Sequence, residues 1–143
     1  MKRLTRCVSL FLVMVLLFTV TAFAAETHRA SLFFTRTSTY LEKTSGTTFD
    51  VWFDVTATGI MDEVGVSSIK IQKSSDKSSW TTVKTFLKEN YSQMTDDNTA
   101  AHDDYVTYTG TAGYYYRAKV TFYAENSSGS GEYVMYTSTI KVP

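Results

Sequence analysis

The sequence has little cysteine, proline or histidine, and charge of neither sign prevails in it. Its 143 residues include one Cys, one Pro and two His, and 14 basic side chains balance 14 acidic ones. A single Cys excludes an internal disulfide and any zinc site built from several cysteines. Nucleic-acid-binding domains normally carry a basic surplus, so the balanced charge argues against a nucleic-acid partner.

Aromatic residues, in contrast, are abundant. The chain contains 2 Trp, 10 Tyr and 9 Phe. This content argues against disorder, because such side chains supply the apolar surface that a core needs. A chain of this length has room for one domain, and we expect no second one.

The first 24 residues have the layout of a secretory signal peptide. Three basic residues begin the segment, positions 8–20 are almost entirely apolar, and Ala22 and Ala24 are the small residues before the expected cleavage site. The apolar run is shorter than the ~20 residues that cross a bilayer. We therefore predict a helical signal peptide over 1–24, cleavage after Ala24 and a secreted domain over 25–143, with no stable membrane insertion after cleavage.

Cleavage at this point would change the composition of the protein. The signal peptide contains the only Cys and three basic residues but no acidic one, so residues 25–143 keep 11 basic and 14 acidic side chains. A secreted domain without disulfides must be held together by its core, and a domain of this size can bury enough apolar surface to do so.

Alternation of apolar and polar residues predicts β-strands along residues 25–143. The clearest alternation covers 49–57, 114–124 and 134–142, and weaker candidate strands are 31–35, 67–73, 80–86 and 104–109. Seven short strands with turns between them are typical of an antiparallel β-sandwich. The fold class is thus predicted as all-β, a single antiparallel sandwich of about seven strands. Residues 88–103 are expected to form a long irregular loop, which is often functional.

Two segments resemble immunoglobulin-like and fibronectin type III-like modules. Residues 71–83 (IQKSSDKSSWTTV) look like a hairpin of such modules, in which a Ser/Asp turn is followed by Trp-Thr and an apolar residue. The segment Tyr116–Val120 resembles the strand that carries the tyrosine corner, with Ala118 where an antibody domain has Cys. The resemblance implies an immunoglobulin-like sandwich. The whole chain also looks like small exported proteins of unknown function in Gram-positive bacteria, which implies a location and no activity.

Few residues are suited to catalysis. After cleavage the only histidines would be His28, near the new N-terminus, and His102, in the expected loop. No nucleophile-elbow or metalloprotease motif occurs, so we expect a protein that is not an enzyme and needs no cofactor. An enzyme with an unrecognised site in the 88–104 loop is the alternative.

Trp52 is the first candidate binding residue. It falls on the polar face of its predicted strand, between Asp50 and Asp54. Many carbohydrate-binding sandwiches hold sugars in this way, with the ring against the pyranose and the acids on its hydroxyls. Tyr115 and Tyr123, on the outward face of another strand, are expected to extend this surface. The alternative is that Trp52 packs beneath a loop or a neighbouring strand, because large aromatic side chains are mostly buried.

The expected loop also contains a candidate calcium site. Calcium prefers six to eight oxygen ligands, and the site would consist of Asp96, Asp97, Asn98, Asp103 and Asp104. The alternative is a solvated acidic loop, because the spacing matches no known calcium loop.

Taken together, the sequence predicts an exported, non-enzymatic binding or structural module at the cell envelope or in the medium. Its partner would be an extracellular protein or a glycan.

Overall fold

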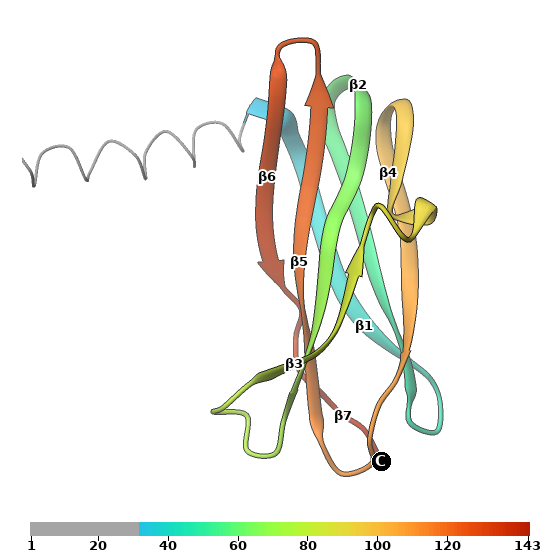
Figure 1. The fold of residues 1–143 in the computed structure, drawn as a ribbon, viewed down its shortest axis with the longest axis vertical. Helices are drawn as coiled ribbons and strands as arrows, with labels where there is room; N and C mark the ends of the chain where they lie inside the picture. The colour runs from blue at the N-terminus through green and yellow to red at the C-terminus, as the bar shows by residue number, and fades with distance from the viewer. Residues whose placement is uncertain (1–31) are drawn as a thin grey trace, which may run out of the picture.

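A computed structural model describes residues 32–143 of the chain, so the predicted signal peptide lies outside the described residues (Figure 1). Antiparallel strands dominate the described part, and none of its helices is long and apolar enough to cross a membrane. In chain order the elements are β1 (Phe34–Ser45), β2 (Thr48–Ser74), β3 (Thr81–Leu87), the 3₁₀ helix η1 (Ser92–Met94), β4 (Thr95–Thr109), β5 (Tyr115–Asn126), β6 (Gly129–Tyr136) and β7 (Ile140–Lys141).

The 27-residue strand β2 organises the whole sheet. Its first half pairs with β1 on one side and with the second half of β4 on the other. Its second half pairs with β5 on one side, and with the start of β4 and then β3 on the other. Between these halves, Thr56 is opposite Ala101 while Met61 is opposite Thr99, so β2 carries extra residues there. Such a bulge bends a strand and increases its twist, which lets one sheet fold over on itself.

The folded sheet has two layers with a core between them. The back layer consists of β1, the first half of β2 and the second half of β4, and the front layer consists of the second half of β2 with β3, β5, β6 and β7 (Figure 1). Alternate residues of β2 and β5 point inward, and the Phe49 and Tyr116 rings meet across the layers at 5.3 Å between centroids. The inward side chains of these two strands are fully or almost fully buried: Phe49, Val51, Phe53, Val55, Val64, Val66, Ile69, Ile71, Tyr116, Ala118, Val120, Phe122 and Ala124.

The structure confirms the all-β fold and changes several predicted elements. The predicted strands at 49–57 and 67–73 are parts of one continuous strand, β2, and the predicted strand at 134–142 is divided between β6 and β7. The expected loop over 88–103 is wrong, because most of it forms η1 and the first half of β4. Residues 95–99 pair with β2 through the backbone. Backbone pairing needs no apolar side chains, so this strand lacks the alternation by which strands are recognised.

The Tyr116 side chain joins the turn between β4 and β5 to the core. Its side chain is completely buried, and its hydroxyl accepts a hydrogen bond of 2.7 Å from the backbone N–H of Thr111, five residues upstream. Gly110 lies directly against the ring, where an added Cβ would come within 2.9 Å of it. The bond fixes the turn between β4 and β5 to the core.

Candidate functional site

Three aromatic side chains form a row across the outer face of the back layer. Trp52 of β2 is opposite Tyr40 of β1 and opposite Tyr105 of β4. The Trp52 ring lies 6.2 Å from the Tyr40 ring at an angle of 8° and 4.6 Å from the Tyr105 ring at 37°. These spacings are in the range where aromatic rings attract one another. We call Tyr40, Trp52 and Tyr105 the aromatic row.

The members of the aromatic row differ in exposure. Tyr40 is 47% exposed and Tyr105 is 41% exposed, whereas Trp52 between them is partly covered. The indole Nε1 of Trp52 is buried and has no hydrogen-bond partner in the described part of the chain. The expectation that Trp52 is a freely exposed stacking surface is therefore too simple, because the two tyrosines present most of the accessible ring area.

The carboxylates next to Trp52 are already engaged. Asp50 is only 8% exposed, and it accepts a hydrogen bond of 2.6 Å from the Thr107 hydroxyl on β4. Asp54 forms an ion pair of 2.6 Å with Arg36 on β1. These contacts join the three strands of the back layer and fix the positions of the Asp50 and Asp54 carboxylates beside the aromatic row. Each carboxylate still has a second oxygen that can accept hydrogen bonds.

Tyr115 and Tyr123 do not extend this surface, contrary to the prediction. Both belong to β5, and their side chains alternate with the buried residues of that strand, so they lie on the outer face of the front layer. Trp52 lies on the outer face of the back layer, on the other side of the core. Alternation predicted correctly which side chains of the strands at 49–57 and 114–124 point outward. It does not tell which layer a strand joins.

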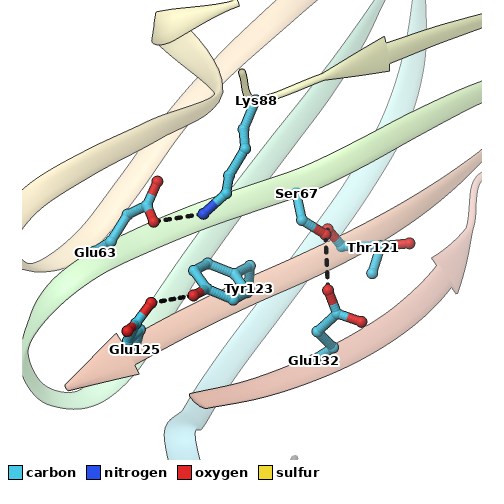
Figure 2. A network of polar contacts seen from close by, with 7 residues as sticks. All are labelled: Glu63, Ser67, Lys88, Thr121, Tyr123, Glu125 and Glu132. Atoms are coloured by element: carbon cyan, nitrogen blue, oxygen red, sulfur yellow. Dashed lines mark hydrogen bonds and ion pairs between the residues drawn. The ribbon is translucent and has the colours of Figure 1, made fainter. Parts of the chain in front are cut away.

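Tyr123 belongs to a polar network on the front layer (Figure 2). Its hydroxyl donates a hydrogen bond to Glu125, and the Lys88 ammonium lies 3.9 Å from the centre of its ring. The same ammonium forms an ion pair of 2.5 Å with Glu63, and the Ser67 hydroxyl donates to another carboxylate, that of Glu132, at 3.1 Å. Burial, the bond to Glu125 and the surrounding carboxylates raise the pKa of Tyr123 well above 10. The phenol therefore stays protonated at neutral pH and is not an activated nucleophile.

Tyr115, at the other end of β5, has cationic neighbours. The Lys77 ammonium lies 4.6 Å from its ring centre and the Lys141 ammonium lies 5.3 Å from it. Cations at these distances are attracted to the ring face. The two tyrosines of β5 thus have different partners and form no common surface.

The residues of the expected calcium site are spread along β4. Neighbouring residues of a strand point to opposite faces, so Asp96 and Asp97 separate from each other, as do Asp103 and Asp104. Asp96 and Asp97 pair with the second half of β2, whereas Asp103 and Asp104 pair with the first half of β2. Asn98 has a left-handed backbone, with φ of 54°. Within residues 32–143, no group of three or more His, Cys, Asp or Glu side chains is gathered so that it could hold a metal ion. The geometry therefore gives the calcium interpretation no support.

A pocket lies where β4 passes β3 and η1. Its volume is about 360 Å³, and its lining residues are Phe86, Tyr91, Gln93, Asp104, Tyr105, Val106 and Thr107. His102 lies beside it and does not line it: its Nε2 is 2.8 Å from the Gln93 carbonyl oxygen, and its ring packs on Phe53. Tyr105 belongs both to this pocket and to the aromatic row.

Tyr40 and Tyr105 are the site residues that the sequence analysis missed. Tyr40 lies beyond the predicted strand at 31–35, although Ser38, Tyr40 and Glu42 alternate outward with the same period. Tyr105 was within a predicted strand, but only the register of three strands places it next to Trp52.

Comparison of the chain with protein-family models, with curated proteins and with solved structures found no match.

Proposed function

We propose that this chain is an exported, non-enzymatic binding module that holds a glycan on the outer face of its back layer. The aromatic row carries the proposal, because three rings in register on adjacent strands form a broad apolar surface. Strands fixed in a sheet hold such rings in place before a ligand arrives, which lowers the ordering cost of binding. Export is proposed from the signal-peptide pattern of residues 1–24.

The polar groups around the aromatic row favour a saccharide. A sugar ring has one apolar face and several hydroxyls, so its site combines aromatic rings with carboxylates. The Asp50 and Asp54 carboxylates flank Trp52 along β2, and Glu42 and Asp103 are their cross-strand neighbours on β1 and β4. We infer that the sugar packs against Tyr40 and Tyr105.

Trp52 has two roles in this proposal. Its ring supports the two tyrosines from the middle of the aromatic row. Its Nε1–H is a buried donor without a partner in the described residues, and leaving such a donor unpaired costs free energy. A sugar oxygen that reaches this group on binding would satisfy it.

Glycan-array binding followed by calorimetry tests the proposal. Tyr40→Ala and Tyr105→Ala should each weaken glycan binding by up to about tenfold, because each removes a ring contact worth up to about 1.5 kcal/mol. Tyr136→Ala is the matched control, since Tyr136 is 50% exposed and belongs to the front layer. The proposal is wrong if no glycan binds, or if the control weakens binding as much as the two back-layer variants do.

A further inference from the structure

The pocket between β4, β3 and η1 combines aromatic walls with a carboxylate. The Phe86 and Tyr91 rings meet edge to face at 5.0 Å between centroids, and Tyr105 closes another side. Asp104 contributes the charge. One of its oxygens accepts a hydrogen bond of 2.7 Å from the Tyr105 backbone N–H, and the other has no partner within residues 32–143. Aromatic faces and a carboxylate around one cavity are complementary to an organic cation.

The protein's own Lys84 already places a cation beside these rings. The Lys84 ammonium lies 5.2 Å from the centre of the Phe86 ring and 6.0 Å from that of the Tyr91 ring. Lys84 itself is exposed on β3, so it can move aside at little cost. A ligand with a cationic group would compete with Lys84 for the same ring faces.

We propose that this pocket binds a primary ammonium group on a short aliphatic stem. The stem would lie against the aromatic rings and Val106, and the ammonium would donate hydrogen bonds to the free oxygen of Asp104 and to the side-chain oxygen of Gln93. A primary ammonium fits better than a quaternary one, because these acceptors need N–H donors. The volume of about 360 Å³ is at the small end of ligand pockets and suits a small amine.

The fold allows two sources of this group. The second half of β4 pairs with β2 on one side only, so its other edge is free in the described part of the chain. Four consecutive residues of that strand, 104–107, line the pocket. An extended polypeptide that added a strand at this edge would place a lysyl side chain in the pocket. A free alkylamine would bind through the same chemistry without the backbone contacts.

An NMR titration of the protein at constant ionic strength tests the site. Butylammonium should give saturable shifts in the amide signals of Tyr105 and Val106, and 1-butanol, with the same stem and no charge, should bind at least about tenfold more weakly. Asp104→Asn should weaken butylammonium binding about tenfold or more. Lys84→Gln should tighten it, since the competing cation is gone.

Asp103→Asn is the matched control, because it removes the same charge one residue away on the opposite face of β4. It should change the affinity less than twofold. The proposal is overturned if butanol binds as tightly as butylammonium, if Asp103→Asn weakens binding as much as Asp104→Asn, or if Lys84→Gln weakens it. The readout is butylammonium binding at this pocket and not glycan binding, so failure here is distinct from failure of the glycan proposal.

A second titration distinguishes the sources. The probe is a blocked Thr-Val-Lys-Val-Thr peptide, compared with the same peptide carrying norleucine in place of lysine. If the lysine peptide binds more tightly than butylammonium, the proposed site is supported and its ligand is a polypeptide. If the lysine peptide binds equally or more weakly than butylammonium, the proposed site is supported and its ligand is a free amine. Where the lysine peptide binds measurably, a norleucine peptide that binds as tightly overturns the proposal.

Discussion

At the scale of single residues, the surroundings of Tyr123 raise the pKa of its phenol well above the ordinary tyrosine value. Burial raises its pKa first, followed by the hydrogen bond to Glu125 and by the charges of Glu125, Glu63 and Glu132. All of these favour the neutral phenol over the phenolate. The folded state therefore binds the Tyr123 proton more tightly than the unfolded state does.

This difference predicts a loss of stability in alkali. The contribution of Tyr123 is fully present below pH 10, the pKa of an unperturbed tyrosine, and it is lost as the pH rises from there toward the higher pKa of the folded state. In urea titrations between pH 9 and pH 11.5, Tyr123→Phe should flatten the fall in unfolding free energy. The change should stay below about 1.4 kcal/mol per pH unit, since solvent screens this partly exposed group.

Tyr136→Phe provides the comparison for this experiment, since Tyr136 is exposed and has Arg117 and Lys119 beside its ring in place of carboxylates. The Tyr123→Phe profile should be flatter than the Tyr136→Phe profile. A Tyr123→Phe profile as steep as the unmodified one would contradict the assignment.

At the scale of elements, β2 depends on a glycine where it passes the start of β4. Gly65 has φ of 154°, and a Cβ added there would lie 2.2 Å from the Met94 carbonyl oxygen and 2.7 Å from the Thr95 Cα. Those neighbours are backbone atoms, so they cannot turn away as a flexible side chain would. The close approach brings η1 and β4 against the second half of β2.

Gly65→Ala should therefore destabilise the fold by about 3 kcal/mol, from overpacking and backbone strain together. Gly59→Ala is the control, because a Cβ at Gly59 would meet nothing within 4 Å, and its effect should stay within about 0.5 kcal/mol. Urea denaturation measures both. Equal stability of the two variants would show that β2 and β4 do not approach each other as described.

The sequence was sufficient for β5 and the first half of β2, whose apolar and polar side chains alternate, and insufficient where pairing depends on the backbone. Phe49, Val51 and Phe53 predicted one buried strand face, and their polar neighbours predicted the outward position of Trp52. The first half of β4, with Asp96 and Asp97, is polar on both faces, so its sequence predicts a loop. The aromatic row could not be predicted, because its members are distant in sequence and only the register brings them together.

At the scale of the whole molecule, the two outer faces have different chemistry. The front layer carries basic residues, Lys70, Arg117 and Lys119, toward one end and the acidic network of Figure 2 toward the other. The back layer carries the aromatic row, with the carboxylates of Asp50, Asp54, Glu42 and Asp103 beside it. Within residues 32–143, aromatic side chains are in register on three adjacent strands only in the back layer, which is why the binding function is proposed for that face.

The two tryptophans of the chain report on these two faces separately. Trp52 is in the aromatic row, whereas Trp80 lies over Arg117 of the front layer, at 4.3 Å from the guanidinium carbon to the ring centre. Trp80→Phe would leave Trp52 as the only tryptophan. Trp52→Phe would leave only Trp80, so the fluorescence of this variant reports on the front layer and serves as the control.

Titration of these variants with glucan, xylan, mannan and chitin oligosaccharides, followed by tryptophan fluorescence, tests the central claim most directly. The account predicts a saturable change in the Trp52 emission of Trp80→Phe with at least one oligosaccharide and a constant emission in Trp52→Phe. Trp52 emission that stays constant with every oligosaccharide, or an equal change in the emission of Trp80, would contradict it.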